Sequence, residues 1–132
     1  MKKAVTFGVL ALALVAGCGS SRPATPAIYS PDASLTSLQK AGWTGAAATG
    51  MPDTLTKARQ VGYLALTAPD GRQLDVQFFE DTSKAAAELA SARKHIEGFR
   101  GATLANAMVF AHPDGKRGLR TGDLDALGKL LK

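Results

Sequence analysis

The sequence predicts a small α+β domain with a mainly antiparallel sheet and helices packed on one face of that sheet. Residues 61–68 and 74–78 flank a Pro-Asp-Gly turn, which is typical of a β-hairpin. An amphipathic stretch at 82–97 and a further apolar segment at 103–111 follow, which together predict a helical crossover to a third strand. A chain of 132 residues with 45% hydrophobic and 20% charged residues has room for one modest core.

The domain is expected to begin with a short helix over residues 32–41. Ser30-Pro31-Asp32 is a helix-start pattern, and Gly42 supplies a stop signal. Residues 44–53 contain two glycines, a proline and several alanines, so we expect a loop there.

The second strand of the hairpin alternates apolar and polar side chains. Leu74, Val76 and Phe78 form the apolar set. Asp75 and Gln77 form the other set and are expected to face solvent, which makes this a half-buried strand.

Asp81 is positioned to cap the helix at 82–97 with its carboxylate. An apolar stripe follows at steps of four and three residues: Ala85, Leu89, Ala92, Ile96 and Phe99. Four charged residues are expected to point elsewhere: Glu88, Arg93, Lys94 and Glu97. A last helix is expected at about 121–131, weakened by its two glycines.

The N-terminus has the pattern of an export signal. Lys2-Lys3 is followed by 14 uncharged residues, 4–17, which as a helix measure about 21 Å. That length is short of the ~30 Å hydrocarbon core of a bilayer, so residues 1–17 are interpreted as a signal peptide rather than a membrane span.

Val15-Ala16-Gly17-Cys18 resembles the lipobox of bacterial lipoproteins: an aliphatic residue, two small residues and a cysteine. The resemblance implies that the Cys18 thiol receives a diacylglyceryl group and that a dedicated peptidase, recognising the three preceding residues, cuts after Gly17. Some members of the class also acylate the new amino group, as with palmitate. The alternatives are an ordinary secretory peptide with a chance cysteine, or an N-terminal core helix.

Residues 18–31 are interpreted as the lipidated cysteine and a flexible tether, and residues 32–132 as the single domain. The stretch 19–31 holds three prolines, three serines and small residues, and it reaches at most roughly 40 Å. The resemblance implies a lipid-anchored protein on the cell membrane or outer membrane, facing the periplasm or exterior. Gly19, where an aspartate signals inner-membrane retention, favours the outer membrane in a diderm host.

Charge and cysteine content exclude several function classes. Without residues 1–17 the chain has 14 basic and 11 acidic residues, a net charge of +3, and the basic residues are scattered. This predicts no nucleic-acid partner. The single cysteine excludes an internal disulfide, and with only two histidines we expect no metal site and no cofactor.

No catalytic motif is recognisable, so we expect a protein that is not an enzyme. His95 or His112 with a nearby carboxylate could serve a hydrolase, but no motif places a nucleophile. Asp75, Glu80 and Asp81 could bind calcium or perform acid–base chemistry, although a helix cap and a solvent-facing side chain explain them equally simply.

Aromatic residues suggest a possible ligand surface at Phe79 and Trp43, because Phe79 lies on the opposite strand face from Phe78. Residues 74–79, 85–89 and 98–99 are also similar to the first half of a SPOR domain. That similarity covers roughly 28 residues, and it implies binding of bare peptidoglycan strands on the sheet.

These observations favour a membrane-anchored bacterial lipoprotein. Its partners would be membrane lipid through Cys18 and an envelope protein or peptidoglycan. The domain is expected to be a non-enzymatic accessory or interaction module; the alternatives are a peptidoglycan- or small-ligand-binding domain and a hydrolase.

Overall fold

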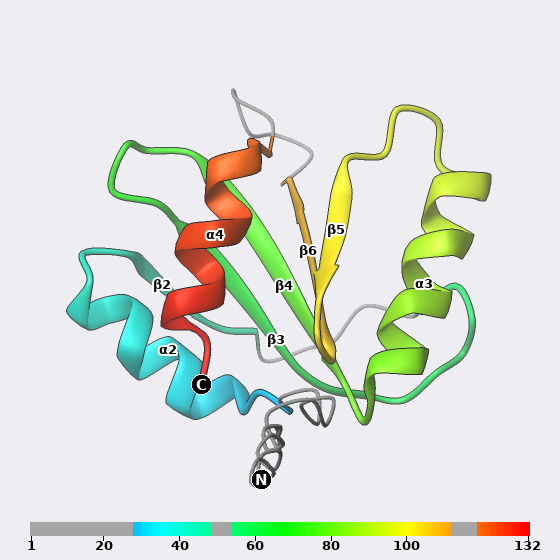
Figure 1. Ribbon diagram of the computed structural model, residues 1–132, viewed down its shortest axis with the longest axis horizontal. Helices are drawn as coiled ribbons and strands as arrows, with labels where there is room; N and C mark the ends of the chain where they lie inside the picture. Colours follow the sequence, from blue (N-terminus) through cyan, green and yellow to red (C-terminus); the bar gives the residue numbers. More distant parts are fainter. Residues whose placement is uncertain (1–27, 49–53, 112–118) are drawn as a thin grey trace, which may run out of the picture.

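The computed structural model describes residues 28–48, 54–111 and 119–132 (Figure 1). Within those ranges the chain forms, in order, α2 (Pro31–Lys40), β2 (Thr44–Ala47), β3 (Gln60–Thr67), β4 (Gln73–Phe79), α3 (Thr82–His95), β5 (Gly101–Leu104), β6 (Ala107–Ala111) and α4 (Thr121–Leu130).

The strands form one sheet in the order β2-β3-β4-β6-β5, and every neighbouring pair is antiparallel. β3 and β4 form the predicted hairpin, whose turn is closed by the hydrogen bond from Gly71 N to Ala68 O at 2.9 Å, with a positive φ at Gly71. Because β4 and β5 are both antiparallel to β6, they are parallel to each other across it, and α3 connects them. The predicted α+β class with an antiparallel sheet is confirmed.

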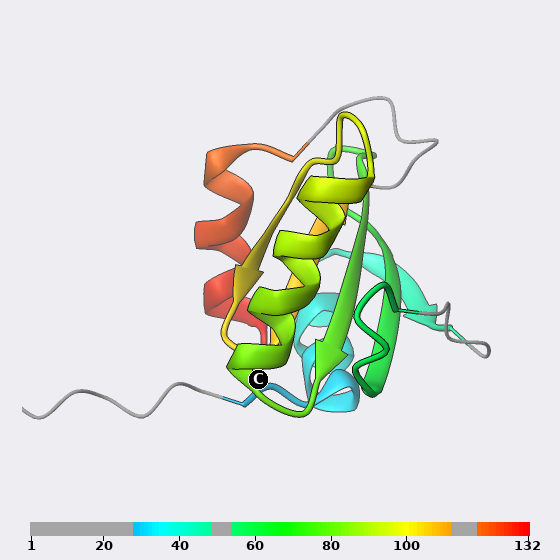
Figure 2. The same ribbon diagram turned by 90° about the vertical axis from the view of Figure 1, so that its right-hand side faces the viewer.

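The helices cover both faces of the sheet, so the expectation that they share one face is wrong. Figures 1 and 2 show α4 and α3 on opposite sides of β5 and β6. The physical reason lies in β4, where both alternating sets of side chains are buried. Phe78 packs in the core under α2 and α4, while its neighbour Phe79 packs under α3 with Leu89 and Met108.

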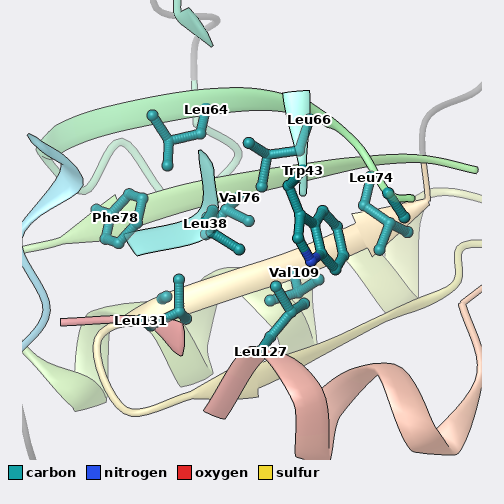
Figure 3. Packing of buried hydrophobic residues seen from close by; sticks show 12 residues of the cluster. Leu38, Trp43, Leu64, Leu66, Leu74, Val76, Phe78, Val109, Leu127 and Leu131 are labelled. Atoms are coloured by element: carbon teal, nitrogen blue, oxygen red, sulfur yellow. The ribbon is translucent and has the colours of Figure 1, made fainter. Parts of the chain in front are cut away.

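The larger core lies between the sheet and the pair of helices α2 and α4 (Figure 3). Its buried members are Leu38, Trp43, Leu64, Leu66, Ala68, Leu74, Val76, Phe78, Ala107, Val109, Leu127 and Leu131. Figure 3 shows the indole ring of Trp43 among aliphatic side chains from the strands and helices. This core therefore joins residues from both ends of the domain sequence.

Two segments differ from the sequence-based expectation. Thr44–Ala47, expected in a loop, is the edge strand β2, whose four residues are all exposed and so give no hydrophobic pattern. The expected strand 103–111 is a hairpin of β5 and β6, because Ala105 adopts a positive φ of 50° and Asn106 turns inward. Ala is unusual at a positive φ, and Asn106 lacks the following glycine that makes Asn-Gly a strong hairpin signal.

The helix α2 begins one residue earlier than expected, whereas α3 begins as predicted and ends earlier than expected. Ser30 caps α2, and the Asp81 carboxylate accepts a hydrogen bond from Lys84 N at 2.9 Å to cap α3. Ile96 leaves the helical conformation and is exposed. The apolar stripe of α3 is therefore buried only at Ala85, Leu89 and Ala92.

Tyr29 and Ser30, which we expected to belong to the tether, are hydrogen-bonded to the folded unit. The buried Asn106 side chain accepts a hydrogen bond from Tyr29 N at 2.7 Å and donates to the carbonyls of Tyr29 and Phe79. Lys132 is bound there too, since its carbonyl accepts from Ser30 N and its N–H donates to Ser34 Oγ. We call this region, where the first described residues meet Asn106 and Lys132, the entry end.

Candidate functional site

The face of the sheet that α3 covers also carries a cluster of polar and aromatic side chains. We call it the polar–aromatic strip, and it consists of Tyr63, Asp75, Gln77, Phe99 and Phe110. Strand pairing places the members of β3, β4 and β6 on one face, because Tyr63 lies opposite Gln77 and Asp75 lies opposite Phe110.

The two polar members of the strip are buried, whereas the sequence pattern predicted that they face solvent. Asp75 is 4% exposed and Gln77 is 5% exposed. The prediction failed because α3 and the neighbouring aromatic residues cover this second face. Phe79 lies two residues after Gln77, so its side chain points to the same face of β4 as those of Asp75 and Gln77. This large apolar side chain was the one signal in the sequence that this face is also covered.

Tyr63 and Asp75 form a hydrogen-bonded pair on adjacent strands. The Tyr63 hydroxyl donates to Oδ2 of Asp75. Burial and this hydrogen bond to a carboxylate raise the pKa of Tyr63, so the phenol keeps its proton throughout the physiological range. The pair thus presents a protonated phenol and a carboxylate rather than a phenolate nucleophile.

Aromatic rings flank this polar pair. The rings of Tyr63 and Phe110 meet edge to face with centroids 6.2 Å apart, and Phe99 lies 5.8 Å from Phe110 in a tilted arrangement. All three residues are half-buried, so each ring keeps part of its surface accessible. Half-exposed rings beside a polar group are a common way of holding a planar or sugar-like ligand.

The side-chain oxygen of Gln77 is buried and has no hydrogen-bond partner among the described residues. Leaving a buried acceptor without a donor costs about 1–3 kcal/mol. Because most buried polar groups in folded proteins have a partner, this oxygen is an exception that needs a physical explanation.

The two residues expected to form a ligand surface do not lie on the surface. Phe79 is 0% exposed in the cluster beneath α3, and Trp43 is 6% exposed in the larger core. Both are core residues because the sheet is covered on both faces. The strip of Tyr63, Phe99 and Phe110 lies on the same face as Phe79.

The other predicted candidates are dispersed. Glu80 and Asp81 pair with Lys84 at the start of α3, with Nζ–O distances of 3.0 and 3.5 Å. His95 lies exposed in the last turn of α3. Among the described residues no group of three His, Cys, Asp or Glu side chains could hold a metal ion.

Residues 15–18 of the lipobox and His112 lie outside the described residues. In the part of the chain that is described, no helix has the length and apolar character needed to cross a bilayer.

Three buried charged residues, Glu88, Arg72 and Asp123, were not predicted from the sequence, and their contacts hold elements together. The Glu88 carboxylate accepts hydrogen bonds from Leu55 N at 2.8 Å, Thr56 N at 3.0 Å and Thr56 Oγ1 at 2.8 Å. The Arg72 guanidinium pairs with both carboxylate oxygens of Asp123. Single charged residues in helices and turns give no sequence signal of such partners, because the partners are distant along the chain.

No family model, curated protein or solved structure matches this chain. The chemistry of the site is therefore inferred from the geometry of its residues alone. Of the strip, the three half-exposed rings are accessible to a ligand, whereas the side chains of Asp75 and Gln77 are buried.

Proposed function

We propose that this protein is a bacterial lipoprotein, anchored by lipid on Cys18, whose small domain is a non-enzymatic interaction module of the cell envelope. The observation that carries the proposal is the sequence Val15-Ala16-Gly17-Cys18 at the end of an uncharged stretch. A thiolate is the nucleophile that lipid transfer requires, and two acyl chains suffice for stable anchoring.

The arrangement of the domain supports this proposal. The first described residues are held at one end of a folded unit, and only the ten residues 19–28 lie between Cys18 and Tyr29. A fully extended segment of that length spans at most about 40 Å. The domain would therefore stay within about one domain diameter of the membrane.

The direct test is mass spectrometry of protein purified from its native membrane. We expect a mature N-terminus at Cys18 carrying a diacylglyceryl thioether, and accumulation of the full-length precursor in cells treated with globomycin. Cys18→Ala should abolish both the lipid and the cleavage, while Cys18 with a free thiol or a leader cut elsewhere would contradict the proposal.

A second candidate function is ligand binding at the polar–aromatic strip, which the unpartnered Gln77 oxygen favours. Purified peptidoglycan is the first ligand to test, because residues 74–79, 85–89 and 98–99 are similar to part of a SPOR domain. Retention on peptidoglycan is expected to fall for Tyr63→Phe and Asp75→Asn. Tyr29→Phe is the matched control, because it makes the same change outside the strip.

Equal retention of Tyr63→Phe and Tyr29→Phe would exclude the strip from peptidoglycan binding. Melting temperatures of the variants identify any loss of binding that comes from unfolding.

A further inference from the structure

We propose that the entry end of the domain contacts the membrane interface, with Ile28 and Val61 as its apolar contact points. This inference rests on the proposed lipid anchor and names the surface of the domain that meets the bilayer.

Ile28 and Val61 lie at the same end of the molecule. Ile28 is 58% exposed and precedes Tyr29, which is held by Asn106. Val61 is 40% exposed and precedes Gly62, on which the Pro31 ring packs so closely that a Cβ there would lie 2.1 Å from Pro31 Cγ. The chain that leads to the anchor and the two exposed apolar side chains therefore share one region.

The charged residues near the entry end are of both signs. Lys132 is exposed and its backbone is bound to Ser30 and Ser34, while the exposed acidic residues Asp32 and Glu80 also lie near this end in the chain segments that meet there. The proposed contact therefore depends on the apolar side chains entering the interface and on the lipid anchor, not on a cationic surface.

The opposite end of the molecule supplies a matched comparison. Ile96 is 45% exposed, close to the value for Val61, and it follows the last residue of α3. α3 starts beside the entry end, since Phe79 is bonded to Asn106, and its 14 residues extend about 21 Å. Ile96 is thus an exposed apolar residue at the end of α3 that lies farther from the proposed contact.

The test uses the mature lipidated protein with one added cysteine: Ile28→Cys, Val61→Cys or Ile96→Cys. The protein has a single native cysteine, whose thiol the lipid occupies, so a bimane label attaches only at the new position. Each labelled protein is reconstituted in vesicles of phosphatidylethanolamine and phosphatidylglycerol whose acyl chains carry bromine, a short-range quencher.

We expect the loss of fluorescence at positions 28 and 61 to be at least about twice that at position 96, because interfacial side chains reach about 5–10 Å into the headgroup and acyl boundary. Equal quenching at all three positions in membrane-bound protein would overturn the inference and leave the anchor intact. Shielding of position 61 from aqueous iodide without quenching by bromolipid would show that a protein covers this end, which also overturns it. Protein that stays off the vesicles altogether would overturn the anchor and the inference together.

Discussion

Arg72 and Asp123 show how one buried ion pair joins the β3–β4 turn to the last helix. The guanidinium is 8% exposed, binds both Asp123 oxygens and bonds Asp70 through Nε at 2.8 Å. Asp123 also accepts a hydrogen bond from Arg120 N at 2.7 Å at the start of α4. The hydrogen bonds to Asp123 raise the pKa of Arg72 despite burial, so this cation is permanent.

Removing one partner of this pair should destabilise the domain. We expect Arg72→Met to lower the free energy of unfolding by about 2 kcal/mol, between the values for exposed and deeply buried pairs, because Asp123 would stay covered without its cation. Urea denaturation measures the change. Lys84→Met, in the exposed pair with Glu80, is the control and should change the free energy of unfolding little. Equal losses of stability in the two variants would show that the Arg72–Asp123 pair contributes no more than an exposed pair.

The same pair predicts a pH dependence with a defined sign. Burial opposes ionisation of Asp123, but the hydrogen bonds from Arg72 and Arg120 N outweigh it and lower the pKa of Asp123 below its ordinary 3.8. A lowered pKa in the folded state stabilises the protein above the unfolded value, and this stabilisation is lost as pH falls through the folded value.

We therefore expect the stability difference between the native protein and Asp123→Asn to be largest near about pH 7 and to shrink below about pH 3. Urea denaturation at the two pH values gives the comparison. A difference that stays constant or grows in acid would rule out this role for the Asp123 charge.

Between elements, Glu88 holds the segment before β3 against α3. Its carboxylate is 3% exposed and binds two backbone N–H groups and one hydroxyl from Leu55 and Thr56. Those donors belong to a connection without regular structure, so the side chain replaces the partners that a helix or sheet would supply. Glu88 is thus a positioning residue for the connection that leads into β3.

Loss of this contact should loosen one segment more than the rest. We expect Glu88→Ala to cost about 2–3 kcal/mol of stability, because three donors lose a charged acceptor. Hydrogen exchange at the Leu55 and Thr56 amides should accelerate. Glu97→Ala changes an exposed carboxylate just beyond the same helix and should leave those amides unchanged; if both variants exchange alike, Glu88 does not secure the connection.

In the whole molecule, two cores share the strands β4 and β6. Phe78 and Val109 point into the core with Trp43, while Phe79 and Met108 point into the core beneath α3. Because the same backbone segments support both cores, we expect the loss of one core to weaken the other. The domain should therefore unfold as one cooperative unit.

Trp43 reports this coupling, since it is the only tryptophan and lies in the core opposite α3. We expect Leu89→Ala, in the core beneath α3, to lower stability by about 2–3 kcal/mol. The transition seen by Trp43 fluorescence should shift together with the loss of helix measured by circular dichroism. Separate transitions by the two probes would mean that the two cores unfold independently.

The sequence determined the elements that depend on local chemistry. Ser30 and Asp81 cap helices, and Pro69-Asp70-Gly71 turns a hairpin, because each acts on backbone groups within a few residues. The lipobox pattern at 15–18 is likewise local, and it stays a prediction with Cys18 outside the described residues. A local signal is sufficient wherever the interacting groups are neighbours in the chain.

Only the tertiary structure decided which side chains are buried. Asp75 and Gln77 looked solvent-facing, and Phe79 and Trp43 looked available to a ligand, until α3 and the α2–α4 pair were found on opposite faces. The face that a helix covers depends on contacts between residues far apart in the sequence, and alternation along one strand is the same whether the second face is open or covered.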